Sequence, residues 1–112
     1  MSAIDQSVIA ERKEEMEDMY PDLVATFVDD AISTLAAIEQ AVQSDSAEDP
    51  RQSAHALKSS SGYMGASLVV ELAGKLEKAG LAGNAASESN IAAELKSAVE
   101  AAIAELTVSK AA

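Results

Sequence analysis

The chain has 112 residues, the size of one domain, and 48% of them are hydrophobic, which is enough to form a core. It has no cysteine, which excludes disulfides and metal sites built on thiolates. The net charge of −11 argues against nucleic acid or an anionic membrane as the main partner, because both attract basic surfaces.

The first predicted element is a short, charged helix over residues 4–19, which we expect to lie across the others as a cover. Its apolar residues are Ile4, Val8, Met16 and Met19. The second predicted helix covers residues 21–43, where Pro21 suits the first helical position and Asp22 suits the positive end of the helix dipole. Its apolar stripe recurs at steps of three and four residues and consists of Val24, Phe27, Val28, Ala31, Leu35, Ile38 and Val42.

The third predicted helix begins between residues 46 and 50 and ends near Gly65, which is most simply a bend or a cap. Its core-facing residues are Ala54, Leu57, Ser61 and Met64. The fourth predicted helix covers residues 67–79, and Gly80 is its expected stop. Its core-facing residues are Leu68, Leu72 and Leu76.

The fifth predicted helix begins around Ser87, after a glycine-containing loop, and frays in its last six residues. Its apolar stripe consists of Ile91, Leu95, Val99, Ala102, Ile103 and Leu106. Four amphipathic helices with short connections predict an all-α fold, an antiparallel up-down four-helix bundle with an additional N-terminal covering helix. We expect one domain over residues 1–112, with the N-terminal helix in 1–20, the bundle in 21–108 and a frayed tail in 109–112.

The sequence also lacks the pattern of a targeting or membrane segment. Residues 1–10 have no basic start, and an acid appears already at Asp5, which is unlike a signal peptide. No apolar run approaches the roughly 20 residues that a membrane helix needs. We therefore expect a soluble cytoplasmic protein.

The third helix carries the chain's one histidine on a nearly bare face. With about 100° per residue and Ala54 set at zero, the core stripe lies near 320° and His55 lies near 100°. The histidine therefore points to solvent. Ser59, Gly62 and Ala66 follow it at one, two and three turns, and none of them has a long side chain. Glycine inside a helix costs about 1 kcal/mol relative to alanine, so its presence on this face needs a reason. A face without long side chains indicates a surface that a partner approaches closely.

An exposed imidazole is suited to carrying a phosphoryl group. Near neutral pH much of it is unprotonated, so a ring nitrogen can act as a nucleophile. Lys58, on one flank of the helix with Arg51, can neutralise an anionic group on His55, and Ser59 can donate a hydrogen bond to it. The simpler alternatives are an incidental surface histidine, a solvated lysine and serines that only pack. A lone histidine is a poor metal site, and no metal is expected.

Residues 54–66, AHALKSSSGYMGA, resemble the signature of histidine-containing phosphotransfer (Hpt) domains. That signature reads His-x-Leu-Lys-Gly/Ser-Ser-small, followed after a few residues by an apolar residue and Gly-Ala. Residues 72–80, LAGKLEKAG, resemble the family's next helix, and residues 27–42 resemble the preceding one. The resemblance covers nearly the whole chain and implies the four-helix bundle with a covering helix.

The resemblance implies that His55 is phosphorylated on Nε2 and exchanges the group with an aspartate of a receiver domain, in a response regulator or a hybrid sensor kinase. Lys58 would pair with the phosphoryl group, and Ser59 stands where many members have glycine. A polar residue on the next helix, facing the histidine, would fall near Glu77 or Lys78. Such a protein is a carrier in a phosphorelay rather than an ATP-using kinase. It needs no cofactor of its own, and Mg²⁺ is expected in the receiver.

The surface around His55 is the predicted docking surface for the receiver. It consists of Arg51, Gln52, Gly62, Tyr63 and Ala66. Tight helix packing is a rival explanation of Gly62, and Tyr63 either borders this surface or covers the bundle edge. The alternative function is a non-phosphorylated helical adaptor for a receiver-like partner. An enzyme with His55 as general base is a third reading, against which stands the lack of an evident orienting acid or cleft. We expect a monomer that binds neither nucleic acid nor membrane.

Overall fold

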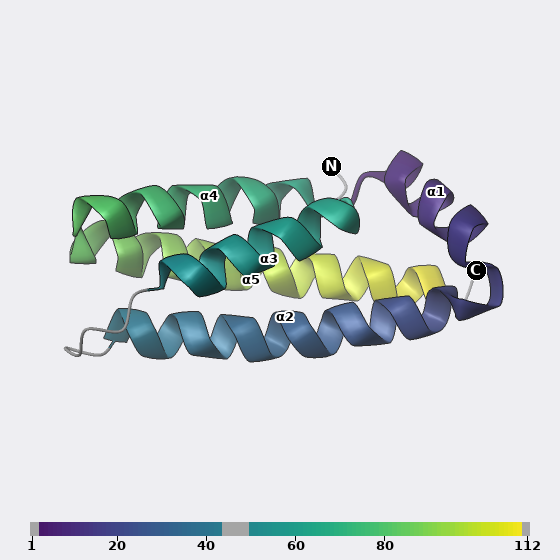
Figure 1. Cartoon of the computed structure of the whole chain (residues 1–112), viewed down its shortest axis with the longest axis horizontal. Coiled ribbons are helices and arrows are strands. Elements are labelled where there is room, and N and C mark those ends of the chain that lie inside the picture. The colour runs from purple at the N-terminus through teal and green to yellow at the C-terminus, as the bar shows by residue number, and fades with distance from the viewer. Residues whose placement is uncertain (1–2, 44–49, 111–112) are drawn as a thin grey trace.

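The computed structural model describes residues 3–43 and 50–110, and its regular elements are all helices. They are α1 (Gln6–Met16), the short 3₁₀ helix η1 (Glu17–Met19), α2 (Tyr20–Gln43), α3 (Arg51–Tyr63), α4 (Ser67–Ala82) and α5 (Ala85–Lys110). Helices α2 to α5 run alternately up and down along the long axis, and α1 crosses one end of them (Figure 1). The predicted all-α four-helix bundle with a covering N-terminal helix is confirmed.

The core of the bundle is formed by the apolar stripes of the four long helices. Their fully buried large side chains include Val24, Ile38, Leu57, Met64, Val69, Leu76, Leu95, Val99 and Leu106. The predicted stripe of α4 is wrong at Leu68, which is 49% exposed. The buried face of that helix is centred on Val69, Leu72, Ala73 and Leu76, so Leu68 in the first turn lies at its edge.

The N-terminal region is two elements rather than the single helix predicted over residues 4–19. Asp5 caps α1, because its side chain accepts a hydrogen bond from the Ser7 amide at 3.0 Å. The helix ends at Met16 because Glu17 has a φ of 49°, and η1 leads directly into α2. Met19, in η1, is 59% exposed and does not belong to the core.

Gly65, just after the end of α3, allows α1 to pack closely against this part of the chain. Gly65 has a φ of 74°, and a Cβ there would lie 2.9 Å from Val8 Cβ and 3.2 Å from the carbonyl oxygen of Asp5. The Asp5 amide also donates to the carbonyl oxygen of Gly65 at 2.8 Å. The predicted bend at Gly65 is therefore confirmed, and the absent side chain lets the N-terminal segment approach closely.

Helix α4 passes through Gly80, which was wrongly predicted to stop it. The helix ends at Ala82, and Gly83 adopts the left-handed conformation with a φ of 68°. A single glycine inside a helix costs only about 1 kcal/mol, which the packing of α4 on its neighbours outweighs. Asn84 then caps α5, accepting a hydrogen bond from the Ser87 amide at 3.1 Å, so α5 begins at Ala85.

The ends of the third and fifth predicted helices also differ from expectation. Helix α3 begins at Arg51, and residues 46–49 of its predicted start lie outside the described residues. Helix α5 does not fray at residue 107 but continues to Lys110. Near its end the hydroxyls of Ser109 and Tyr20 lie 2.7 Å apart, which joins it to α2. Of the predicted frayed tail, residues 111–112 lie outside the described part.

Candidate functional site

His55 stands on the exposed face of α3, as the helical periodicity predicted. Its side chain is 64% exposed, whereas Leu57 is buried in the core. Ser59 and Gly62, one and two turns further on, are exposed as well. A Cβ added to Gly62 would meet Val70 Cγ2 at 3.8 Å, an ordinary van der Waals distance. Helix packing therefore does not require this glycine, and the bare surface beside His55 needs another explanation.

A carboxylate on the neighbouring helix contacts both His55 and Lys58. Glu77 of α4 places Oε2 3.2 Å from His55 Nδ1 and Oε1 2.8 Å from Lys58 Nζ. The Glu77 side chain is 23% exposed, so it lies partly buried between α3 and α4. The hydrogen bond from Lys58 and a smaller contribution from His55 hold the pKa of Glu77 below its ordinary value, although burial opposes this. Glu77 is therefore ionised at neutral pH.

This contact assigns the tautomer of the neutral imidazole. An ionised carboxylate can only accept hydrogen bonds, so the ring nitrogen facing Glu77 must be the one that carries the proton. Nδ1 of His55 is then a donor, and Nε2 keeps its lone pair. Because the side chain is largely exposed, Nε2 is the ring nitrogen left for a partner. The pair supplies the orienting acid that was not evident in the sequence.

An open hollow lies beside the imidazole, where α2, α3 and α4 meet. It is lined by Ala37, Ala41, Arg51, Gln52, Ser53, His55, Glu77 and Leu81. Leu81 is 70% exposed and, with the two alanines, gives the hollow an apolar part. Two predicted docking residues, Arg51 and Gln52, are at its rim and exposed. A partner that reaches His55 can therefore bury apolar surface next to the imidazole.

The sequence signature and this geometry agree with one known family. A family model described as the Hpt domain matches residues 22–105, which is most of the chain. The chain belongs to the Hpt domain family. Comparisons with curated proteins and with solved structures gave no significant match. Hpt domains are phosphocarrier modules that take part in phosphotransfer in two-component systems and interact with receiver domains.

In this Hpt domain the signature residues divide between surface and core. His55 and Ser59 are exposed and Lys58 is half-buried, whereas Leu57, Ser61 and Met64 are buried. Among the serines, Ser60 donates to the carbonyl oxygen of Leu57 at 3.2 Å, away from the imidazole. The roles predicted for Lys58 and Ser59 at a phosphoryl group stay predictions.

Of the predicted docking surface, Ala66 is not where it was expected, and Tyr63 contacts the N-terminal helix. Ala66 has no exposed surface, so its assignment to the docking surface was wrong. The left-handed Gly65 ends α3 and turns Ala66 into the core at the start of α4. Tyr63 is 45% exposed, but its ring lies 4.2 Å from the Arg12 guanidinium, which also donates to the Tyr63 carbonyl oxygen. Tyr63 thus joins α3 to α1 and lies two turns from His55.

The hollow contains residues that sequence reasoning did not select. Leu81 was missed because α4 was expected to end at Gly80, which removed it from the helix. A helical wheel of α4 that continued past Gly80 would have placed Leu81 about 40° from Glu77, on the face toward α3. Glu77 was considered together with Lys78, and the structure selects Glu77. Ala37 and Ala41 gave no signal, because alanine is common on both faces of these helices.

The described part of this Hpt domain contains no group of three His, Asp or Glu side chains arranged to hold a metal ion. None of its helices is both long and apolar enough to cross a bilayer.

Proposed function

We propose that His55 accepts a phosphoryl group from the aspartyl phosphate of a receiver domain and donates it to the aspartate of another receiver. The observation that carries this proposal is the contact of Glu77 with Nδ1, which leaves Nε2 as the nucleophile on an exposed and uncluttered helix face. The receiver belongs to a response regulator or a hybrid sensor kinase, and the chain serves as an intermediate carrier in the cytoplasm.

The transfer is a displacement at phosphorus. The lone pair of Nε2 attacks the phosphorus of the aspartyl phosphate, an N–P bond forms, and the bond from phosphorus to the carboxylate oxygen breaks. The electron pair of that bond leaves with the aspartate of the receiver. The imidazole keeps the proton on Nδ1 and becomes positively charged as the bond forms. The Glu77 carboxylate, 3.2 Å from Nδ1, stabilises this developing charge.

Lys58 can contact the phosphoryl group on His55 while it keeps its ion pair with Glu77. Its ammonium group has three donors, and one of them is directed at Glu77 at 2.8 Å. The others can donate to oxygens of a phosphoryl group on His55, one turn away along α3. Ser59 follows His55 by one turn on the same exposed face and can donate from its hydroxyl. The chain supplies nucleophile and charge partners, and the receiver supplies its aspartate and Mg²⁺.

A phosphotransfer assay tests the proposal. The purified chain is incubated with receiver domains that have been phosphorylated with radiolabelled acetyl phosphate. We expect an acid-labile, alkali-stable label on the wild type and none on His55→Ala. Lys96→Ala, on the far side of the bundle, is the matched control and should take label like the wild type. Equal labelling of His55→Ala would show that another residue accepts the group.

The same assay separates the carrier from the non-phosphorylated adaptor. An adaptor would bind a receiver through the face around His55 but would take no label, and its affinity would be unchanged in His55→Ala. Circular dichroism of each variant shows whether the fold is retained, so a loss of label can be attributed to the missing imidazole.

A further inference from the structure

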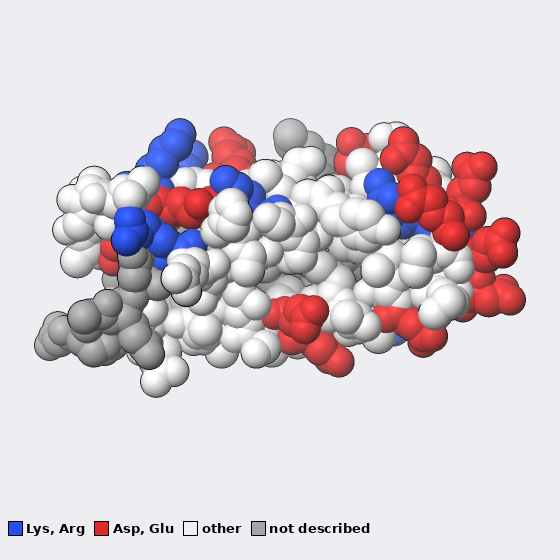
Figure 2. Space-filling model, viewed as in Figure 1, with Lys and Arg blue, Asp and Glu red and all other residues white. Residues whose placement is uncertain are grey.

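Positive charge is concentrated on the two helices that form the His55 site. Helices α3 and α4 together carry four Lys or Arg and two Glu, a balance of +2, although the whole chain carries −11. The four basic residues, Arg51, Lys58, Lys75 and Lys78, are called the basic face below. In Figure 2 most of the blue side chains lie over α3 and α4, toward the end where the chain enters α3, and the others lie at the α1 end.

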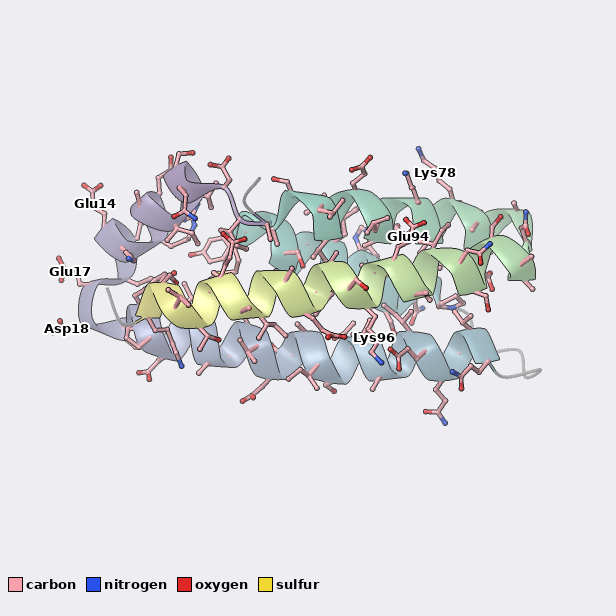
Figure 3. All side chains as sticks on the ribbon, turned by 180° about the vertical axis from the view of Figure 1, so that it is seen from behind. Glu14, Glu17, Asp18, Lys78, Glu94 and Lys96 are labelled. Atoms are coloured by element: carbon pink, nitrogen blue, oxygen red, sulfur yellow. The ribbon has the colours of Figure 1, made fainter. Side chains whose placement is uncertain are left out.

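Most of the acids lie on the other elements. Residues 6–19, which form α1 and η1, contain five Asp or Glu and two basic residues, and α2 contains four acids and no Lys or Arg. Figure 2 shows the red side chains gathered at the α1 end of the molecule. Glu14, Glu17 and Asp18 project outward there in Figure 3. Within residues 3–43 and 50–110, the two helices that form the His55 site thus carry an excess of positive charge, and the α1 end carries an excess of negative charge.

Two residues of the basic face, Lys75 and Lys78, are only weakly neutralised or not neutralised by the described residues. Lys75 is 3.8 Å from Glu71, and both side chains are more than half exposed, so this pair is weak. Lys78 forms no ion pair among residues 3–43 and 50–110, and it points away from the bundle in Figure 3. It directly follows Glu77, the residue that contacts His55. Exposed charges of this kind do little for stability but act on an approaching partner.

We propose that the partner docks on the basic face through an acidic surface, so that its reacting group is surrounded by an excess of Asp and Glu. This inference rests on the proposed function and identifies the class of receiver that the chain selects. The positive region attracts such a partner, and the acids on α1, η1 and α2 repel it from the rest of the molecule. The field therefore increases the encounter rate and also orients the partner toward His55.

Association kinetics with matched charge reversals test this inference. The probe is the receiver domain that binds the His55→Ala chain most tightly, and docking is measured by stopped-flow fluorescence in this His55→Ala background, where no transfer occurs. The test variant is Lys75→Glu/Lys78→Glu. The control is Lys96→Glu/Lys110→Glu, which makes the same charge change on α5, where Lys96 points toward α2 (Figure 3).

At about 10 mM salt, where charges act over about 30 Å, we expect the test variant to associate at least about tenfold more slowly than its parent. The control should change the rate by less than about threefold. At about 150 mM salt, where the range falls to about 8 Å, the difference between test variant and parent should shrink.

Equal slowing of test and control variants, or a test variant that associates as fast as its parent, would overturn the inference. Because docking is measured without transfer, this result is distinct from a failure of the proposed function, which would appear as an unlabelled wild type. A chain that no receiver binds would reject both.

Discussion

The contact between Glu77 and His55 can be tested by removing one charge and little else. Glu77→Gln keeps the size of the side chain, and its amide oxygen can still accept a hydrogen bond from Nδ1. The tautomer is therefore retained, whereas the negative charge next to the imidazole is lost. Lys58 loses its ionic partner at the same time. The variant thus removes the negative charge that stabilises the imidazole during transfer, while the size of the side chain is kept.

The size of the effect follows from the geometry. Hydrogen bonds to charged groups contribute about 1.5–3 kcal/mol, against about 1 kcal/mol for neutral ones. Because the His55 side chain is 64% exposed, water screens the carboxylate, and the low end of this difference applies. A loss of about 0.5 kcal/mol in the transition state slows transfer about twofold, since each 1.36 kcal/mol corresponds to a factor of ten.

The assay is the single-turnover rate of label transfer from a phosphorylated receiver at saturating receiver concentration, which separates chemistry from docking. Glu71→Gln is the control, because it makes the same chemical change on the exposed side of the same helix. We expect Glu71→Gln to transfer at the wild-type rate. A Glu77→Gln variant that transfers as fast as Glu71→Gln would refute the role assigned to the carboxylate.

Four further outcomes are expected. The lowered pKa of Glu77 means that its pairing stabilises the fold at pH above its ordinary value of 4.5 and is lost as pH falls through the lower folded-state pKa. Urea titrations should accordingly show wild type more stable than Glu77→Gln at pH 7, with a difference that narrows as the pH falls below 4.5; a difference that stays constant in acid would contradict the assignment. Gly65→Ala should lower the free energy of unfolding by about 1–3 kcal/mol, because its φ of 74° and the approach of Val8 leave no place for a Cβ. Gly62→Ala should instead raise it by up to about 1 kcal/mol, and equal destabilisation of the two variants would disprove the difference between these glycines. Ser61→Ala should stabilise the chain by about 1 kcal/mol, since the buried hydroxyl lacks a hydrogen-bond partner among the described residues; a loss of stability would reveal a bond that the structure does not show.

The sequence predicted the features that depend on periodicity within one helix. The apolar steps in residues 24–42 defined α2 and its buried face, and a helical wheel placed His55 on the exposed side of α3. Both inferences need only the geometry of a single helix, which is the same wherever the helix packs. For the same reason the all-α bundle followed from the number of stripes and the short connections between them.

Features that depend on how two segments meet were not predictable in the same way. The approach of Glu77 to His55 depends on the axial register of α4 against α3, which periodicity in either helix leaves open. Tyr63 could not be placed because its partner, Arg12, is 51 residues away in sequence. Ala66 was misplaced because the wheel was continued through Gly65, although a left-handed residue ends the helix and redirects the chain.

The most direct test of the account is the state of the one imidazole before and after phosphorylation. Because the chain has a single histidine, a long-range proton–nitrogen NMR spectrum of the labelled protein contains one pair of ring nitrogens. We predict that Nδ1 carries the proton in the resting protein and that the phosphoryl group appears on Nε2, with Nδ1 still protonated. Phosphorylation at Nδ1, or a resting imidazole with its proton on Nε2, would contradict the account.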